Sequence, residues 1–392
     1  MQKTDSTQYF IQKLRRKLKK NRLILLIYFI THYKKYIYEK SFYPEKEHKS
    51  KFCVFCEFIC HILKHGELDE SYFVLGIDVK GVKYDEYLSY EQYKRRRDRL
   101  NGIRRDCFDD AEPLNYSCIL RDKSLFSIFG YYWGFPVVRD LAKVINNKVI
   151  DSEYSSIYDI LKTNHHVFVK PIDGQKGKSI YGIDMIDNEL YVNGEKYSVS
   201  DAVSLIEKKS EVHVMLLQNR IIQHPVVSDL HKESVNTLRV VTINHLHSSN
   251  PEEVILVGSE LRVGSGGRHT DNVSAGGLKI AVNENGALAE YGFYDKAHGT
   301  KTQVHPDSGI LFQDIMLPYY DEAIQLSKKF HSKLKEIHLI GWDIAITENG
   351  PVFIEGNESC GTDFQVMFGP MRKYYDKYLP CQKCRDRYSF NY

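Results

Sequence analysis

The stretch IGWDIAITENGPVFIEGN, residues 340–357, decides the fold of the second half of the chain. Two apolar-rich runs flank a short ENG turn, and an Asn-Gly pair between such runs is a strong signal for a β-hairpin. Asp343 stands near the start of the first run, and Glu355 and Asn357 stand at the end of the second. Because an antiparallel hairpin brings these ends together, the three side chains are expected to meet on one face of a sheet.

Three oxygen donors at one point favour a divalent cation. Two carboxylates about 4 Å apart repel by about 4 kcal/mol at an effective dielectric constant of about 20, so a cation is expected between them. The set holds no His or Cys, and oxygen ligands suit Mg²⁺, with Mn²⁺ as the alternative. Asp343, Glu355 and Asn357 are therefore predicted to bind the metal. The competing interpretation is a pair of solvated carboxylates at a strand end.

A second segment, FVKPIDGQKGKSIYG at residues 168–182, is predicted to cover phosphates. A strand ends near Lys170, a turn containing Gly174 and Gly177 follows, and the chain returns as a strand. Glycine lets backbone N–H groups approach phosphate oxygens, and the lysine adds a positive charge. A Walker-type P-loop is excluded, because its spacing requires a glycine where Ile172 stands. The competing interpretation is an ordinary glycine-containing β-turn.

Three arginines stand on expected strands or glycine-rich turns between these segments: Arg239 in VNTLRVVTI, Arg262 in SELRVG and Arg268 in GSGGRHTDNVSAGG. A guanidinium group binds two oxygens of a phosphate, carboxylate or acyl phosphate at once. Taken singly, each arginine also fits a surface ion pair. The sequence has no GxSxG or HExxH motif, and Cys360 has no assignable base nearby, which disfavours nucleophilic hydrolysis and a histidine metal site.

Short strands and a few helices alternate after Pro113, which predicts an α+β fold of mostly antiparallel sheets with helices packed against them. The strands are expected to be half-buried, because most of them alternate apolar and polar residues. The expected strands are 166–172, 179–186, 212–219, 238–244, 253–263, 278–283, 340–347 and 351–357. The expected helices are 122–133, 198–208 and 317–334.

The N-terminal third of the chain reads as helical. Residues 89–105, SYEQYKRRRDRLNGIRR, are predicted to form an exposed helix rich in charge. Nucleic-acid binding is not expected, because the chain shows no recognisable module and no basic groove with interleaved aromatic residues.

The cysteines allow two interpretations. Cys53, Cys56 and Cys60 have the spacing of one buried helix face. Cys53 and Cys56 also form a CxxC pair, as do Cys381 and Cys384, so a four-thiolate zinc site is the alternative.

The net charge of +3 over 392 residues conceals an uneven distribution. Residues 1–50 hold 13 Lys or Arg and 4 Asp or Glu, against 41 and 47 in the rest of the chain. Basic residues beside the apolar run Leu23–Ile30 suit contact of residues 1–30 with an anionic membrane surface, although so short a run cannot span a bilayer. The competing interpretation is a surface helix leading into a buried one. With few cysteines and no export signal, the expected location is the cytoplasm or the inner face of its membrane.

Taken in order, these segments resemble the ATP-grasp superfamily over about residues 115–370, and most closely its branch associated with sugar transfer. The resemblance implies two α+β lobes that hold ATP between antiparallel sheets. It implies three parts of the chain. These are a helical N-terminal region at 1–112, an N-lobe with the phosphate loop at 113–217 and a C-lobe with the metal site at 218–392.

The same resemblance assigns roles to individual residues. The implied ATP-binding residues are Lys123, Lys170, Gly174, Gln175, Lys176, Gly177, Lys178, Ser179, Gln218, Asn219, Arg220 and Ile221. The implied catalytic residues are Arg239, Arg262, Arg268 and Asn272. One departure from the family pattern is the Gln218-Asn219 pair, at a hinge where many relatives carry a glutamate.

The implied reaction is a Mg²⁺-dependent ligation. ATP would phosphorylate a small-molecule or glycan carboxylate, and an amine would attack the acyl phosphate to form an amide, in the assembly of a capsule or exopolysaccharide. Enzymes of a glycosyltransferase pathway are the implied partners. Two alternatives keep the fold: a kinase that phosphorylates a sugar hydroxyl, and a non-catalytic ATP-binding partner of a glycosyltransferase.

Overall fold

The computed structural model divides the chain into two compact units. The described residues are 21–101, 116–172, 180–361 and 364–379. The first unit consists of residues 1–99, 104–112 and 361–392, and the second consists of residues 100–103 and 113–360. The family resemblance implies a C-lobe at residues 218–392, and this division stays a prediction; by compactness, the structure groups residues 361–392 with the N-terminal unit.

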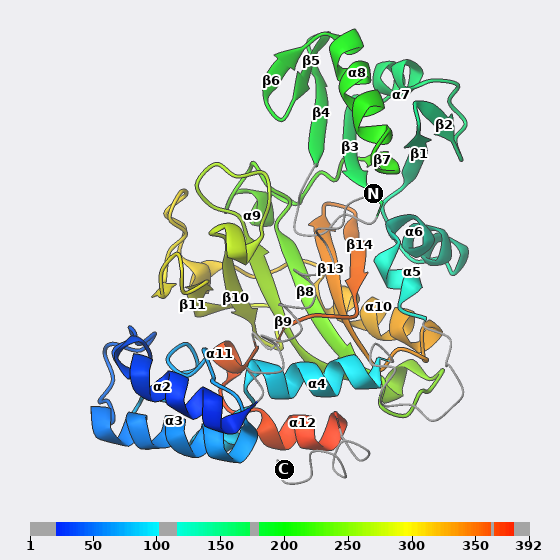
Figure 1. Cartoon of the computed structure of the whole chain (residues 1–392). Helices are drawn as coiled ribbons and strands as arrows, with labels where there is room; N and C mark the ends of the chain where they lie inside the picture. The colour runs from blue at the N-terminus through cyan, green and yellow to red at the C-terminus, as the bar shows by residue number, and fades with distance from the viewer. Residues whose placement is uncertain (1–20, 102–115, 173–179, 362–363, 380–392) are drawn as a thin grey trace, which may run out of the picture. The chain divides into compact units, whose positions relative to one another are not determined.

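The N-terminal unit is built from helices (Figure 1). They are α2 (Arg22–Ile37), α3 (Lys51–His65), the 3₁₀ turn η1 (Tyr84–Glu86), α4 (Tyr90–Leu100), α11 (Phe364–Phe368) and α12 (Arg372–Tyr378). Ser50 caps the start of α3, and Gly66 ends it in the left-handed conformation at φ 68°. α2 packs on α3 through aromatic rings, with the centroid of Phe29 lying 5.4 Å from that of Phe58.

The prediction of an exposed, charged helix at residues 89–105 is wrong for the part that the structure describes. In α4 the side chains of Tyr93, Arg96 and Arg97 are buried. Arg96 forms an ion pair with Asp376 of α12 at 2.6 Å, which offsets part of the cost of burying its charge. A run of charge does not reveal its buried face, because long arginine stems cover apolar surface as aliphatic residues do.

The prediction of a buried cysteine face on α3 is also wrong. Cys53 and Cys60 are exposed, and the buried face of α3 is formed instead by Val54, Phe58 and Ile62. Within the part of the chain that the structure describes, no group of three or more His, Cys, Asp or Glu side chains could hold a metal ion. The second CxxC pair, at residues 381–384, lies outside the described residues.

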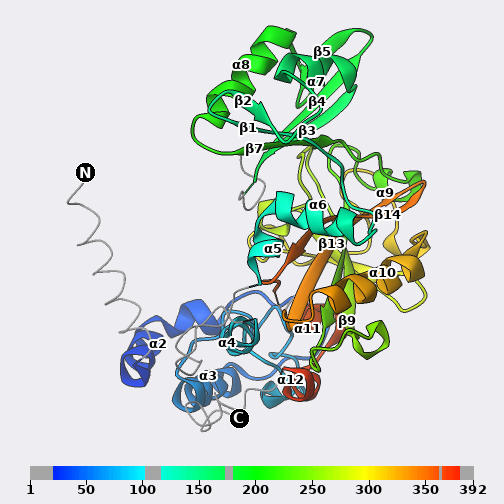
Figure 2. The same ribbon diagram turned by 90° about the vertical axis from the view of Figure 1, so that its right-hand side faces the viewer.

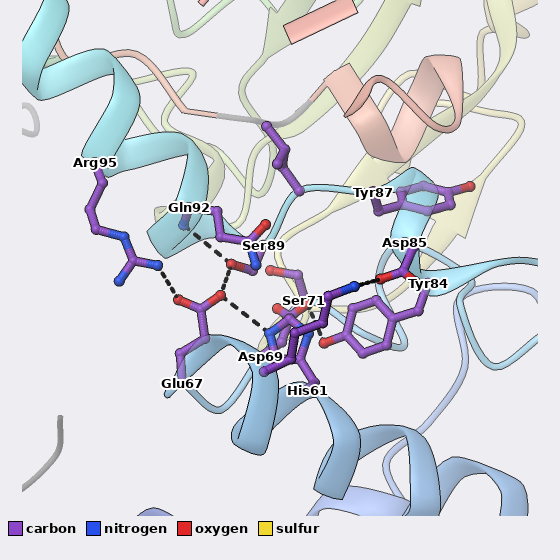
Figure 3. A network of polar contacts seen from close by, with 12 residues as sticks. His61, Glu67, Asp69, Ser71, Tyr84, Asp85, Tyr87, Ser89, Gln92 and Arg95 are labelled. Carbon is purple, nitrogen blue, oxygen red and sulfur yellow. Dashed lines mark hydrogen bonds and ion pairs between the residues drawn. The ribbon is translucent and has the colours of Figure 1, made fainter. Parts of the chain in front are cut away.

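A buried carboxylate organises the polar interior of the N-terminal unit (Figure 3). Glu67 accepts hydrogen bonds from His61 at 3.2 Å, from Arg95 at 2.9 Å and from Ser89. Burial raises the pKa of Glu67, but His61, Arg95 and Ser89 outweigh it, so the pKa of Glu67 lies below its usual value. The ring of Tyr84 stacks on His61, which closes the network on one side. Glu67 therefore stays ionised and fully hydrogen-bonded inside this unit.

The second unit begins with an antiparallel sheet, called here the N-lobe sheet, in the order β2-β1-β7-β3-β4-β5-β6. Its strands are β1 (Asp140–Ile145), β2 (Lys148–Ile150), β3 (His166–Pro171), β4 (Tyr181–Ile186), β5 (Glu189–Val192), β6 (Glu195–Tyr197) and β7 (Met215–Asn219). Helices α7 (Ile157–Thr163) and α8 (Val199–Ser210) lie against it (Figures 1 and 2). Ser156 and Ser198 cap these helices, and their apolar residues complete the core of the lobe.

A second antiparallel sheet, called here the C-lobe sheet, has the order β12-β11-β10-β9-β8-β13-β14. Its strands are β8 (Thr237–Ile243), β9 (Ile255–Val263), β10 (Leu278–Val282), β11 (Leu288–Tyr294), β12 (Lys301–Thr302), β13 (Leu339–Thr347) and β14 (Gly350–Asn357). The remaining helices are α5 (Cys118–Arg121), α6 (Lys123–Tyr132), α9 (Pro225–Ser228), η3 (Pro251–Glu253), η4 (Val273–Ala275), η5 (Phe312–Asp314) and α10 (Tyr320–Lys333). Trp342 of β13 stacks on Phe330 of α10, and Phe126 of α6 joins the same core.

The eight predicted strands and the three predicted helices are all present, although several ends shift by a few residues. The sequence did not predict six short or peripheral strands: β1, β2, β5, β6, β11 and β12. The expectation of half-buried strands is wrong for β8 and β10, which are buried along their whole length. Their two faces are covered for different reasons, because one joins the apolar core and the other carries charged side chains that bury one another.

Candidate functional site

The hairpin of β13 and β14 brings the three predicted metal ligands together. Asp343 stands directly opposite Glu355 in the strand register, and a β-bulge follows Asp343. The amide nitrogen of Asn357 donates to Asp343 at 3.1 Å and to Glu355 at 3.2 Å. Residues opposite each other in antiparallel strands share a face, so the three side chains lie on the face turned away from Trp342.

Arg239 extends this group across the neighbouring strand. Strand β8 sets Arg239 opposite Asp343, and the guanidinium group holds both carboxylate oxygens of Asp343, with Nη2 to Oδ2 at 2.6 Å. Burial raises the pKa of Asp343, but the charge and hydrogen bonds of Arg239 outweigh it, so that pKa falls below its usual value. The repulsion expected between Asp343 and Glu355 is therefore already offset in part by a protein cation.

Two lysines approach Glu355 from other elements. Lys123 begins α6, whose first turn is capped by Asp122, and its ammonium group lies 3.8 Å from Oε2 of Glu355. Lys170 lies near the end of β3 and is only 4% exposed. Burial, together with the charge of Lys123, lowers the pKa of Lys170 to about 8, against the opposing effects of Glu355 and Asp140. Lys123 and Lys170 thus lie within electrostatic reach of each other and of Glu355, which belongs to the other lobe of this unit.

A second charged row crosses the same sheet face beside the first. Arg262 of β9 stands opposite Thr237 on one side and Lys279 on the other, and its Nε donates to Glu260 at 2.8 Å. Glu260 stands opposite Arg239 and is almost fully buried, and its Oε2 has no hydrogen-bond partner among the residues that the structure describes. A buried carboxylate oxygen without a hydrogen bond lowers the stability of the fold. Glu260 therefore indicates that this row of charged residues serves a function other than stability.

Sequence reasoning missed Glu260, Lys279 and Asp271. The signal for Glu260 was present, because Glu260 and Arg262 are two residues apart in a strand and must share a face. Lys279 lacked such a signal, since its place beside Arg262 depends on strand order.

The loop after β9 carries Arg268 and Asn272. Arg268 is exposed, and its guanidinium group lies over Gly276, where any Cβ atom would overlap it. Asn272 caps the short turn η4 through its side chain. Asp271 ties the loop to β8 by accepting hydrogen bonds from the backbone N–H of Thr237 at 3.2 Å and from its hydroxyl group. Burial raises the pKa of Asp271 to about 6, partly opposed by Thr237.

The predicted hinge lies at the end of β7. The Gln218 side chain points into the N-lobe, donating to Asp140 at 2.5 Å and to Ser127 at 3.4 Å. Arg220 pairs with Asp184 of β4, and Ile221 is half-buried. Adenine contacts at residues 218–221 therefore remain predictions. The predicted phosphate-loop residues, Gly174 to Ser179, lie outside the described residues.

Solved structures with similar chain traces include three ligases. A D-alanine–D-alanine ligase from Bacillus anthracis is 9% identical over 69% of this chain and 71% of its own, with a TM-score of 0.38. The ATP-grasp ligase PsnB, complexed with a minimal precursor variant, Mg and ADP, is 13% identical over 62% and 51%, with a TM-score of 0.30. An L-amino acid ligase from Bacillus licheniformis is 11% identical over 68% and 49%, with a TM-score of 0.35. Such distant likeness assigns no substrate to this chain.

No curated protein sequence is significantly similar to this chain. The model of one protein family, described as sugar-transfer associated ATP-grasp, matches residues 106–371, which is more than half of the chain. That span includes both seven-stranded sheets, Lys123, Lys170 and the charged rows of the C-lobe sheet. The chain therefore belongs to the sugar-transfer associated ATP-grasp family.

Proposed function

We propose that this protein is an ATP-dependent ligase that activates a carboxylate for attack by an amine. The observation that carries the proposal is the approach of Lys123 and Lys170 to Glu355, which shares a sheet face with Asp343. Buried cations beside acidic oxygen donors suit a polyphosphate bound together with a divalent metal. The family and the names of the ligases with similar traces agree with this assignment.

The donor set fits Mg²⁺. Asp343, Glu355 and Asn357 would hold the ion, and when bound it would offset charge on the phosphate oxygens. Each of the three side chains bears oxygen, and Asn357 presents its own oxygen once its amide turns, a rotation that the hydrogen-bond network alone decides.

The lysines bind and orient the phosphates. In the free protein the Lys170 side chain is mostly deprotonated above about pH 8, because burial disfavours its charged form. Anionic phosphate oxygens raise the pKa of Lys170 again, so a bound phosphate keeps the ammonium group charged at a pH where the free protein begins to lose the proton. The interaction is therefore strongest with the ligand bound, which is the property a catalytic cation needs.

Arg239 and Arg262 lie on the same face and would stabilise the transferred phosphoryl group. In the first step the bond from the γ-phosphorus to the bridging oxygen of ADP breaks as a substrate carboxylate oxygen bonds to phosphorus. In the second step an amine nitrogen bonds to the acyl carbon, phosphate leaves with its oxygen, and the amine proton passes to solvent. Neither step needs a protein nucleophile, and fixed positive groups supply most of the catalysis.

The experiment is an ADP-release screen with Mg²⁺ over pairs of sugar acids and amines. A ligase releases ADP and phosphate only when a carboxylate and an amine are both present. A stable phosphoester on a sugar hydroxyl would instead identify a kinase, and ATP binding without turnover in any mixture would identify a non-catalytic binding partner. The sugar acids are included because of the family's association with sugar transfer, from which we also propose a role in surface-polysaccharide assembly.

Two variants and one matched control test the site itself. Lys170→Ala and Glu355→Gln should each reduce turnover by about 10²–10³-fold. Lys196→Ala is the control, because Lys196 belongs to the same N-lobe sheet but pairs with Glu189 on the exposed edge. Full activity of both site variants would show that the site is assigned wrongly.

A further inference from the structure

Helix α2 is apolar on two opposite faces. Leu25, Phe29 and Tyr36 are buried, and Phe29 packs on the α3 ring of Phe58. Leu23, Ile27 and Ile30 are 65%, 55% and 49% exposed. At about 100° per residue these three point roughly opposite to the buried face.

The exposed apolar residues of α2 lie in a line, whereas those of an ordinary protein surface are scattered. Leu23, Ile27 and Ile30 follow the spacing i, i+4, i+7, so they form one continuous line along the helix, here called the outer stripe. The helix is kinked at His32, and Lys34 and Lys35 follow the kink. A line of three large aliphatic side chains beside lysines is the composition of a helix that lies at an interface between water and an apolar phase.

The charge around the outer stripe selects the kind of interface. Residues 11–35 contain nine Lys or Arg and no Asp or Glu. Among them, Arg22, Lys34 and Lys35 belong to α2 itself, at its two ends. Basic side chains that flank inserted apolar ones can pair with phosphates of anionic lipids, each contributing to attraction within about a Debye length of the surface.

The size of the outer stripe disfavours both a membrane-spanning helix and a protein partner. Within the described residues no helix is long and apolar enough to cross a membrane. A specific protein interface commonly buries about 800 Å² on each partner, far more than three side chains in one line provide. Insertion of a few aliphatic side chains beside basic residues is, by contrast, sufficient for reversible binding to a bilayer surface.

We propose that the outer stripe of α2 docks on the surface of an anionic lipid bilayer. Leu23, Ile27 and Ile30 insert among the acyl chains nearest the headgroups, and Arg22, Lys34 and Lys35 at the two ends of the helix contact the lipid phosphates. The proposal is independent of the ligase reaction, because it concerns the N-terminal unit alone. It would bring the enzyme to lipid-borne substrates without a spanning segment.

The test is flotation of the full chain with vesicles of phosphatidylcholine alone and of phosphatidylcholine with about 30% phosphatidylglycerol. We expect binding to the anionic vesicles, weak binding to the neutral ones and release at high salt. The triple variant Leu23→Ser, Ile27→Ser, Ile30→Ser should reduce binding roughly tenfold or more. Its thermal unfolding and its ATP turnover in solution should match those of the wild-type chain.

Helix α3 offers a matched control. Phe52 and Leu63 are 77% and 50% exposed, but no comparable excess of basic residues surrounds them. Phe52→Ser with Leu63→Ser should therefore leave flotation unchanged. The proposal is overturned if the wild-type chain stays unbound with anionic vesicles, or if the α2 and α3 variants lose binding equally. It is also overturned if the α2 variant only converts a dimer into a monomer by light scattering.

Discussion

Two buried carboxylates in this protein differ in how completely they are hydrogen-bonded. In the N-terminal unit, Glu67 receives hydrogen bonds from three side chains and is held ionised (Figure 3). In the second unit, one buried oxygen of Glu260 has no hydrogen-bond partner within the described part of the chain, and Lys170 is buried with its pKa lowered to about 8. A carboxylate with all its hydrogen bonds made stabilises a fold, whereas a buried cation with a lowered pKa holds charge ready for a ligand. The comparison predicts that mutations of Glu67 and of Lys170 affect different quantities.

The largest effect is expected at Arg239. Arg239→Gln leaves the Asp343 carboxylate buried without its cation, which should lower the free energy of unfolding by about 3–5 kcal/mol. Adding Asp343→Asn removes the stranded charge and should recover most of that stability, without restoring turnover. Urea denaturation of the single and double variants measures the coupling. Equal stability of the two would mean that Asp343 is not held by Arg239.

Lys170 should behave in the opposite way. Lys170→Met should reduce turnover by about 10²–10³-fold, because a cation that binds the phosphates is lost. Its free energy of unfolding should stay the same or rise, since a buried ammonium group is replaced by an apolar side chain of similar length. Parallel ADP-release and thermal-unfolding measurements decide the matter. If the variant has a lower unfolding temperature but unchanged ATP turnover, Lys170 has a structural role and does not bind the phosphates.

Glu67 is expected to affect stability without affecting chemistry. Glu67→Gln places an amide donor either against Arg95 or against Ser89 and His61, which should cost about 1–3 kcal/mol in the free energy of unfolding. Turnover per folded molecule should remain. Glu47→Gln serves as the control, because its ion pair with Lys80 is exposed and should contribute less than about 1 kcal/mol. Loss of turnover in folded Glu67→Gln would undo the distinction between Glu67 and Lys170.

The smallest effect is a pH dependence that belongs to Lys170. In the free protein its pKa is lowered from 10.5 to about 8, so its charge disappears as the pH rises through 8. The apparent affinity for ATP should then fall, approaching tenfold per pH unit above 8, because binding must restore the proton. The stability of the unliganded protein depends on pH in the opposite direction, rising as the pH increases. The stability penalty from Lys170 is full below pH 8 and relaxes between pH 8 and 10.5. Nucleotide titrations from pH 7 to 9.5 should show this slope, and Lys170→Met should abolish it.

The local pattern of the sequence predicted much of the second unit. All eight expected strands and the hairpin at residues 340–357 are present, because alternation of side chains and an Asn-Gly turn act over a few residues. Those same short-range signals placed Asp343, Glu355 and Asn357 at neighbouring strand ends. Edge strands such as β2 and β6 escaped prediction, since each is only three residues long.

The short-range signals failed where burial depends on distant residues. The charged helix α4 was expected to be exposed, but Arg96 is buried against Asp376, a residue about 280 positions further along the chain. The apolar spacing of Cys53 and Cys60 suggested a buried face, yet the packing of α2 and α3 selected Val54 and Phe58 instead. Periodicity identifies a face of a helix, and only its neighbours decide whether that face is covered.

The sequence by itself determined the fold class, the strands that carry the candidate site and the residue types available there. The tertiary structure alone decided which charges meet. Arg239 and Asp343 are 104 positions apart, and they pair because β8 lies beside β13 in the sheet. Glu260 and Lys170 acquired their unusual environments in the same way, through strand order and burial. The physical reason is that hydrogen-bonded turns and side-chain alternation are local, whereas desolvation and Coulomb interactions depend on distance in space.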